Sequence, residues 1–353
     1  YKLLVLDANA RYMTLPVLKK IDELVNGGAV VAGDKPVAIP SLSDDASEFK
    51  AIADRLWANE KGENIIGKGK VLAGMKAGEA LEAMKISSDF SYSKPQDDTK
   101  LMFVHRKAGN ADFFWVNNRK AAVQDLEAEF RVTGKEAEIW HPETGRIEKA
   151  SYSIGEGSTK VPLHLEAEDA VFVVFRNKAR KASFTVPATV EKQLASIEGP
   201  WTVKFQEKRG APAEATFESL KPWNDNADKG IKYFSGIGTY TKTLNAPAEW
   251  FSEGSELWLD LGNVKNLAEV IINGQSLGIV WKTPFRVNVT GALKEGDNKL
   301  EIKVINLWVN RLIGDQQPDV GEKITYTTMR FYRADSPLLP SGLLGPVSLV
   351  GKA

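Results

Sequence analysis

The stretch Ala268-Glu269-Val270-Ile271-Ile272-Asn273-Gly274 decides the fold of the last part of the chain. Its β-branched run predicts a strand, and Asn-Gly is a strong hairpin signal because both residues tolerate the positive φ angles of a type I′ turn. Leu277-Gly278 begins the strand that returns. Other runs with strand alternation cover residues 201–205, 238–244, 257–261, 285–289 and 298–304. We therefore expect residues 195–353 to form an antiparallel β-sandwich.

A second series of short strands fills residues 88–185. The apolar runs recur at even spacing, and turn signals such as Thr133-Gly134-Lys135 separate them. The runs cover residues 101–104, 113–116, 126–132, 137–140, 147–154, 161–165 and 170–175. Strands at this spacing are typical of another antiparallel sandwich. A linker over residues 176–194 is expected to join it to the last sandwich.

The first part of the chain, residues 1–87, alternates strand and helix patterns. Its strand candidates are residues 3–6, 29–32, 64–66 and 70–72. Helical periodicity covers residues 14–25, 45–57 and 78–84. This order predicts parallel strands with right-handed crossovers, and hence a small doubly wound α/β domain. Since the chain opens directly into a strand, we expect residues upstream of Tyr1 to have been removed and this domain to be partial.

The composition is that of a globular, multi-domain chain. Its 353 residues exceed one ordinary core, and 43% hydrophobic with 26% charged residues is a normal balance. Lysine plus arginine and aspartate plus glutamate both number 46, so charge gives no reason to expect nucleic acid or an anionic membrane as partner. No apolar run has the length of a membrane span. Without cysteine the chain has neither a disulfide nor a thiolate metal site.

The residues around the Asn-Gly hairpin resemble a known carbohydrate-binding domain. Residues 232–243 read Lys-Tyr-Phe-Ser-Gly-Ile-Gly-Thr-Tyr-Thr-Lys-Thr, and Leu259-Asp260-Leu261-Gly262 and Pro284-Phe285 flank the hairpin. As a set, these stretches resemble the sugar-binding domain of family 2 type glycoside hydrolases. The resemblance implies that the last sandwich is a galactose-binding-like jelly roll.

Two further stretches are more specific. Residues 304–315 read Val-Ile-Asn-Leu-Trp-Val-Asn-Arg-Leu-Ile-Gly-Asp, and residues 339–347 read Leu-Pro-Ser-Gly-Leu-Leu-Gly-Pro-Val. With Gly278-Ile279-Val280-Trp281 they resemble the C-terminus of the glycoside hydrolase family 106 α-L-rhamnosidases. Met13-Thr14-Leu15-Pro16, followed by Gly27-Gly28-Ala29-Val30-Val31, resembles the small α/β domain after the catalytic barrel of these enzymes. The resemblance covers most of the chain and is weakest in the middle sandwich.

In such enzymes the catalytic carboxylates lie in a (β/α)₈ barrel, and too few βα units precede residue 87 to build one. The resemblance therefore implies a non-catalytic C-terminal region that supports the upstream catalytic barrel of the same polypeptide. It also implies a plant-type or other polysaccharide as partner, and a bacterial periplasmic or secreted location. Two alternatives stay open: an independent carbohydrate-binding or surface scaffold protein, and an enzyme with an active site at a domain junction.

Carboxylates and histidines form no recognisable catalytic or metal site. Glycoside hydrolysis needs two carboxylates across a cleft, and we interpret Glu138 as an outward strand charge and Asp260 as a turn or ladder contact. The chain has only three histidines, His105, His141 and His164. Their wide spacing argues against a transition metal, and we expect His164 to face solvent. We predict no cofactor; oxygen ligands in the loop 223–228 suit a structural calcium, although we favour an Asx-turn loop.

Polar and aromatic residues at the rim of the last sandwich are the candidates for carbohydrate binding or for contacts between domains. They are Trp223, Asn224, Tyr233, Trp281 with Lys282, Asn306, Trp308, Asn310 and Arg311. Indole rings stack on sugar rings, and amide and guanidinium groups bond to hydroxyls. The alternatives are that Trp308 belongs to the core and that Asn310-Arg311 forms a structural corner. For residues 306–315 we favour a contact between domains, since tryptophan and arginine are enriched at interfaces.

Overall fold

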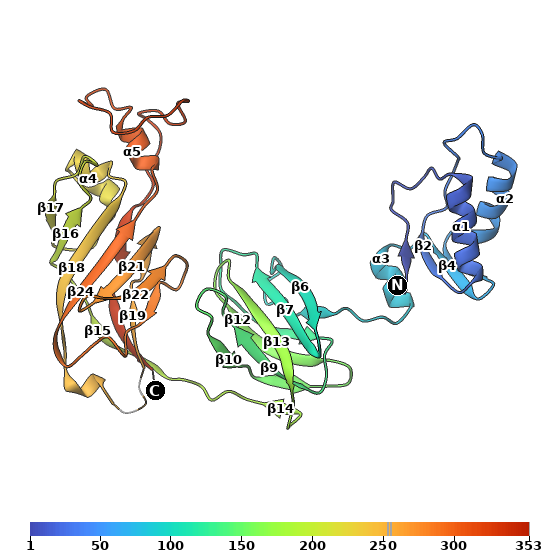
Figure 1. Ribbon diagram of the computed structural model, residues 1–353, viewed down its shortest axis with the longest axis horizontal. Coiled ribbons are helices and arrows are strands. Elements are labelled where there is room, and N and C mark those ends of the chain that lie inside the picture. Colours follow the sequence, from blue (N-terminus) through green and yellow to red (C-terminus); the bar gives the residue numbers. More distant parts are fainter. Residues whose placement is uncertain (253, 255, 353) are drawn as a thin grey trace.

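The computed structural model describes residues 1–252, 254 and 256–352, and most of its regular structure is β-strand. Figure 1 shows three bodies in chain order, joined by extended segments. Their main apolar cores are separate clusters, which lie within residues 13–73, 90–175 and 197–349. The expectation of a mostly β chain with several antiparallel sheets is therefore confirmed.

The first body contains a four-stranded sheet in the order β1-β2-β4-β3. Its strands are β1 (Leu4–Val5), β2 (Val30–Gly33), β3 (Gly62–Ile66) and β4 (Gly69–Ala73). Its helices are α1 (Leu15–Asn26), α2 (Ala46–Leu56) and α3 (Ala77–Ala83). β1, β2 and β4 are parallel, as predicted, but β3 runs antiparallel to β4. The prediction is wrong for β3 because the two-residue turn Gly67-Lys68 can only reverse the chain.

Local sequence explains how the helices of this body are placed. The apolar stripe of α1 is Leu15, Leu18, Ile21 and Val25. Asp45 caps α2, because its carboxylate accepts from the backbone N–H groups of Ser47 at 2.8 Å and Glu48 at 3.0 Å. After α2, the indole of Trp57 donates to the carbonyl of Gly33 at 3.0 Å. This bond fixes the end of α2 to the end of β2.

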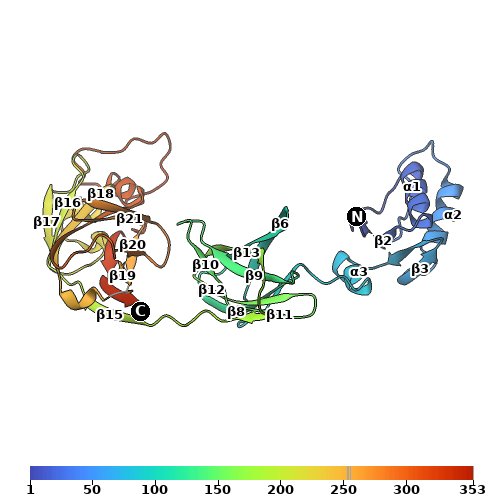
Figure 2. The ribbon, with the colours of Figure 1, turned by 60° about the horizontal axis from the view of Figure 1, so that its bottom comes forward.

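The middle body has two five-stranded antiparallel sheets, β10-β9-β13-β7-β6 and β14-β11-β12-β8-β5, which Figure 2 shows as two layers. The strands are β5 (Phe90–Tyr92), β6 (Leu101–Ala108), β7 (Ala111–Asn118), β8 (Gln124–Phe130), β9 (Lys135–Trp140), β10 (Ile147–Lys149), β11 (Tyr152–Ile154), β12 (Thr159–Leu165), β13 (Ala170–Lys178) and β14 (Ser183–Phe184). Phe114, Phe130 and Phe175 meet between the layers, where each is fully buried.

Two details of this body differ from the prediction. The single strand expected over residues 147–154 is two strands, since β10 pairs with β9 in one sheet and β11 pairs with β12 in the other. Ala150-Ser151 carries the chain across, and Ala150 is buried between the sheets. The expected linker over 176–194 also contains regular structure. β13 extends to Lys178, β14 follows, and β15 covers Glu191–Ser196. The segment without strands between β14 and β15 is therefore only residues 185–190.

The last body has a six-stranded sheet, β17-β16-β18-β24-β21-β22, and a four-stranded sheet, β15-β26-β19-β23, with the pair β20-β25 beside them. Its remaining strands are β16 (Trp201–Phe205), β17 (Glu214–Phe217), β18 (Ile237–Ala246), β19 (Glu256–Asp260), β20 (Asn263–Lys265), β21 (Leu267–Ile272), β22 (Gln275–Val280), β23 (Arg286–Asn288), β24 (Gly296–Ile305), β25 (Gly342–Gly345) and β26 (Ser348–Lys352). Its helical turns are η1 (Trp223–Asp225), α4 (Lys229–Lys232), η2 (Ala248–Trp250) and α5 (Val309–Gly314).

The Asn-Gly hairpin is confirmed. Asn273 and Gly274 have φ angles of +52° and +84°, and they connect β21 to its antiparallel partner β22. The side chain of Asn273 also donates to the amide oxygen of Asn298 at 2.8 Å and accepts from the backbone N–H of Lys299 at 3.0 Å. The turn is therefore attached to β24, the strand beside β21 in the centre of the sheet.

Lys282, in the turn between β22 and β23, connects the last body to the middle one. Its ammonium contacts the carboxylates of Asp169, which precedes β13, and Glu143, which lies between β9 and β10. Although partial burial opposes the charge, these two carboxylates hold the pKa of Lys282 above its ordinary value. Lys282 is thus engaged in a contact between the two sandwiches.

Candidate functional site

The residues predicted at the rim of the last sandwich do not form one site. Trp223 is fully buried, its indole donates to the hydroxyl of Tyr240 at 2.6 Å, and its ring stacks on that of Tyr240. Burial holds the pKa of Tyr240 far above its ordinary value, so this hydroxyl stays neutral. The predicted rim position of Trp223 is therefore wrong, because its ring fills the core and offers no face to a sugar.

The other aromatic candidates are dispersed. Trp281 is 62% exposed beside the contact made by Lys282, and Trp308 is 45% exposed at the start of α5. Trp308 therefore does not belong to the core, and the guanidinium of Arg209 lies 4.7 Å from its ring centroid. Tyr233 is half-buried next to α4. Asn224 is also half-buried, and its amide donates to the side chain of Asp225 at 2.9 Å.

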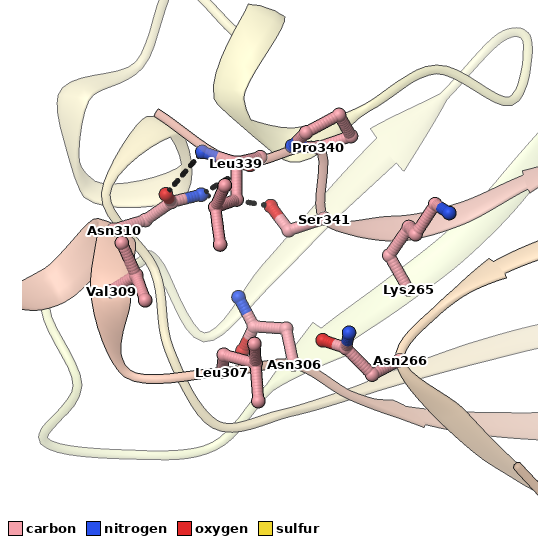
Figure 3. A pocket seen from close by; sticks show the side chains of 9 residues that line it. All are labelled: Lys265, Asn266, Asn306, Leu307, Val309, Asn310, Leu339, Pro340 and Ser341. Carbon is pink, nitrogen blue, oxygen red and sulfur yellow. Dashed lines mark hydrogen bonds between the residues drawn. The ribbon is translucent and has the colours of Figure 1, made fainter. Parts of the chain in front are cut away.

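Two predicted residues, Asn306 and Asn310, line a pocket of about 230 Å³ at one end of the last sandwich (Figure 3). Asn306 follows β24, and Asn310 lies in α5. The rest of the wall comes from the β20–β21 connection, the start of α5 and the segment before β25. These residues are Lys265, Asn266, Leu307, Val309, Leu339, Pro340 and Ser341. Segments far apart in the sequence thus converge on this pocket.

The amides of Asn306 and Asn310 hold the pocket walls together. Asn306 donates to the carbonyl of Phe234 at 2.8 Å and accepts from the N–H of Gly236 at 3.0 Å. Asn310 donates to the carbonyl of Leu339 at 2.7 Å and accepts from the N–H of the same residue at 2.9 Å. In each amide, the nitrogen and the oxygen both form a hydrogen bond with the protein backbone, so these atoms are not free for a ligand. For Asn310 this favours the structural corner.

Lys265 and Asn266 present the free polar groups of the pocket. Among the residues that the structure describes, neither side chain has a hydrogen-bond or ion-pair partner. Leu307 and Leu339 add apolar surface, with 50% and 40% of each side chain exposed. Donors next to apolar surface suit a sugar ring, which has hydroxyls on its edge and C–H groups on its faces. No carboxylate occurs among the nine described residues of the wall, so the pocket holds no acid–base pair.

Arg311 is an internal ion-pair partner and is not available to a ligand. It is 5% exposed, and its guanidinium lies 2.9 Å from the carboxylate of Asp315, which is 1% exposed. Asp315 also accepts from the backbone N–H of Ile324 at 3.1 Å and from the N–H and hydroxyl of Thr325. Burial opposes ionisation of Asp315, but these bonds and Arg311 hold its pKa below the ordinary value. The pair fastens the segment after α5 to the sandwich.

The carboxylates singled out in the sequence have structural partners. Glu138 accepts from the indole of Trp140 at 2.8 Å and from Nε of Arg176 at 3.0 Å. Asp260 accepts from Nε of Arg286 on the neighbouring strand at 2.7 Å, which is the ladder contact we expected. Both groups are therefore committed to cations or donors of their own sheet.

The loop 223–228 uses its oxygen atoms for its own turns. The side chain of Asn226 accepts from the N–H of Asp228 at 3.0 Å, and Asp228 caps α4 by accepting from the N–H of Gly230 at 2.7 Å. Over residues 1–252, 254 and 256–352, no three histidine, aspartate or glutamate side chains gather as a metal site would require. The side chain of His164 is 58% exposed, so its predicted solvent-facing position is confirmed.

The sequence analysis overlooked an apolar surface on the middle sandwich. Six residues on the sheet β10-β9-β13-β7-β6 alternate with core positions and face away from the other sheet. We call them the outer aromatic face: Val104, Phe113, Trp115, Trp140, Ile147 and Phe172. The signal was present in Phe113-Phe114-Trp115-Val116, which is apolar at every position, so both faces of β7 are apolar.

Two family models match the chain. The one described as alpha-L-rhamnosidase matches residues 1–154, and the one described as a glycosyl hydrolase 2 galactose-binding domain-like module matches residues 224–333. The first match covers the α/β body and the start of the middle sandwich. It does not include residues 304–315, whose sequence suggested the same family.

A solved rhamnosidase from Novosphingobium sp. PP1Y is similar to nearly the whole chain. Its TM-score is 0.91 and its identity is 44%, over 99% of this chain and 33% of that chain. A putative beta-glucuronidase from Formosa agariphila is 23% identical over 94% of this chain and 49% of its own length. The chain thus spans about half of this curated relative and one third of the rhamnosidase.

No helix within the described ranges is both long and apolar enough to cross a membrane. The resemblance stated from the sequence is confirmed: residues 1–154 match the α-L-rhamnosidase family, the last sandwich is galactose-binding domain-like, and a rhamnosidase shares the fold of nearly the whole chain.

Proposed function

We propose that this chain is the non-catalytic part of a rhamnosidase-like glycoside hydrolase, in which it supports the catalytic barrel and helps to bind a polysaccharide. The observation that carries the proposal is the likeness to the Novosphingobium rhamnosidase, which extends over 99% of this chain but only 33% of that chain. The catalytic barrel then belongs to the portion of such an enzyme that has no counterpart here. A periplasmic or secreted location fits a polysaccharide as partner.

The chemistry of the described residues supports a non-catalytic role. Hydrolysis of a glycosidic bond needs an acid and a base, or an acid and a nucleophile, opposed across a cleft. Asp169 and Glu143 of the middle sandwich both contact the ammonium of Lys282 of the last one. This shared ion pair argues against Asp169 and Glu143 as an acid and a base at the junction.

The pocket next to α5 is the best-supported place for a sugar. Lys265 and Asn266 supply free donors there, and Leu307 supplies apolar surface. Its volume of about 230 Å³ lies below the range of about 300–1,000 Å³ typical of drug-sized ligands, so it suits a small ligand such as a single sugar unit. The ammonium of Lys265 adds a preference for a sugar with an acidic group.

Hydrolysis of an aryl α-L-rhamnoside tests the non-catalytic role. The 353-residue chain should show no turnover above background, while the natural longer polypeptide that contains it should hydrolyse the substrate. Turnover by the short chain alone would contradict the proposal and would direct attention to the carboxylates at the junction. Absence of any longer reading frame would instead favour an independent carbohydrate-binding or surface scaffold protein.

Calorimetric titration with rhamnose-containing oligosaccharides tests the pocket. Replacing Lys265 and Asn266 together by alanine should weaken binding at least about tenfold, since two polar contacts are lost. Lys299→Ala is the matched control, because this lysine is 63% exposed on a strand of the same sandwich and pairs only within it. Equal binding by the double variant and the control would exclude the pocket as the sugar site.

A further inference from the structure

The outer aromatic face forms an unbroken apolar row across the middle sandwich. The strand registers place Ile147 opposite Trp140, Trp140 opposite Phe172, Phe172 opposite Trp115, and Trp115 opposite Val104. One residue comes from each strand of the five-stranded sheet. With neighbouring strands about 4.8 Å apart, the row is about 19 Å long. This length is comparable to the width of a protein–protein contact.

This row belongs to the outside of the sandwich. Its sequence neighbours Phe114, Val116 and Val173 lie in the core between the two sheets, and side chains alternate along a strand. At the two ends of the row, Val104 is 43% and Ile147 is 49% exposed. Figure 2 shows the layer with β6, β13 and β9, whose strands carry the row, above the layer with β8, β11 and β12.

Two charged groups beside the row, Glu138 and Arg176, are engaged with each other and with Trp140. Glu138 accepts from the indole of Trp140 at 2.8 Å and from Arg176 at 3.0 Å, and the Arg176 guanidinium lies 5.0 Å from the Trp140 ring centroid. A sugar platform needs free donors and acceptors near its aromatic rings, because the hydroxyls of the sugar must exchange bonds with water for bonds with protein. The engagement of Glu138 and Arg176 at the centre of the row, and the aliphatic side chains of Val104 and Ile147 at its ends, favour a protein partner over a polysaccharide.

The composition of the face is that of a buried interface. Tryptophan, phenylalanine and arginine are enriched in the centres of interfaces, and Arg106, opposite Phe113, supplies a charged rim. A sheet with two apolar faces is typically covered on both. The rhamnosidase that shares this fold is about three times as long as the matched region, so further polypeptide is available there to cover this face.

From this arrangement we propose that the outer aromatic face is the docking surface for the catalytic barrel of the same polypeptide. The proposal rests on the proposed function, since it names the surface through which the chain supports that barrel. The middle sandwich, rather than the sugar-binding-type sandwich, then makes the main apolar contact with the catalytic part.

Thiol labelling tests the docking directly, because the chain has no cysteine of its own. Val104→Cys places a thiol in the row, and Val123→Cys is the matched control on the β8 side, since Val104 and Val123 are 43% and 44% exposed. Each variant is made in the 353-residue chain and in the natural longer polypeptide. Maleimide labelling of the introduced cysteine is followed by mass spectrometry of its peptide.

Docking predicts that the Val104→Cys variant is labelled at least about tenfold more slowly in the longer polypeptide, because a covered thiol reacts only after local opening. Labelling of the Val123→Cys variant should be unchanged. Equal rates for Val104→Cys in the two proteins, or equal slowing of both variants, would overturn the proposal. Protection of the Val104→Cys thiol in the short chain by added polysaccharide would overturn it too, in favour of a sugar platform. Since labelling needs no substrate, this result is independent of the hydrolysis that tests the proposed function.

Discussion

The two sandwiches use their aromatic residues in opposite ways. In the last sandwich Trp201, Trp223 and Tyr240 are fully buried between the sheets. In the middle sandwich Trp115 and Trp140 lie outside the core, on the outer face of one sheet. An abundance of tryptophan in a carbohydrate-related chain is therefore no guide to a sugar site until each ring is assigned to a face.

The same difference shows that the domain with recognisable family motifs need not be the one that exposes apolar surface. The last sandwich carries the sequence motifs that match a sugar-binding domain, yet its largest aromatic residues stabilise the core. The middle sandwich, of which the rhamnosidase family model matches residues up to 154, presents an apolar row on the outer face of one sheet. Motifs identify a fold through the residues that build it, whereas an interface depends on residues that the fold itself does not need.

The largest expected effect on stability comes from removing the buried ring of Trp223, compared with removing the exposed ring of Trp281. Trp223→Ala should lower the free energy of unfolding by about 3–5 kcal/mol, because it empties a core site and removes one of the two N–H donors to the Tyr240 hydroxyl, the other being Leu343. Trp281→Ala, at a side chain that is 62% exposed, should change it by less than about 0.5 kcal/mol. Urea unfolding followed by circular dichroism measures both. Similar losses would contradict the assignment of Trp223 to the core.

Breaking the buried ion pair of the last sandwich should have the next largest effect. Asp315→Ala leaves Arg311 buried without its counter-charge, and we expect a loss of about 3 kcal/mol. Asp319→Ala is the control, since that carboxylate is 56% exposed and pairs with Lys229 at the surface. The control should unfold almost as the parent does. A stable Asp315→Ala protein would show that Arg311 finds water or another partner there.

The same carboxylate predicts how acid acts on the last sandwich. The folded-state pKa of Asp315 is lowered from its ordinary value of 3.8, so its ionised form stabilises the fold. This stabilisation is complete above the pKa of the unfolded chain and is lost as pH falls below about 3.8 and through the folded-state value. Thermal unfolding between pH 5 and 2 should therefore show a steeper loss for the parent than for Asp315→Ala. Parallel curves would mean that other carboxylates dominate acid unfolding.

Sequence reasoning succeeded where a local pattern determines the structure. Asn273-Gly274 and the apolar stripe of α1 are signals within a few residues, and both appear as expected. It failed where the outcome depends on distant partners. Nothing near Trp223 in the sequence reveals that Tyr240 lies against it, and Lys265 reaches the pocket of Asn310 only through the fold. The outer aromatic face was readable in the apolar run 113–116, but only once β7 was known to be a central strand.

Separating the two sandwiches should have a smaller effect than breaking either core. Lys282→Ala removes the contact with Asp169 and Glu143, and we expect a cost of about 1 kcal/mol because the ammonium is partly exposed. The two sandwiches should then move and melt more independently, which small-angle scattering and calorimetry detect. Lys299→Ala, which removes a pair within one sandwich, serves as control. If the scattering profile does not change, the contact does not hold the two bodies together.

The smallest effect should come from the outer aromatic face in the isolated chain, and its size should depend on context. Val104→Thr replaces one methyl by a hydroxyl at a side chain that is 43% exposed, so the 353-residue chain should keep its unfolding free energy within about 0.5 kcal/mol. In the longer polypeptide the same hydroxyl would be desolvated under the barrel, at a cost of about 1–3 kcal/mol unless it finds a partner. Denaturant unfolding of parent and variant in both proteins measures the difference. An equal loss of unfolding free energy in the two proteins would mean that β6 is open to solvent in both. Docking would then not explain why the two sandwiches place their aromatic residues differently.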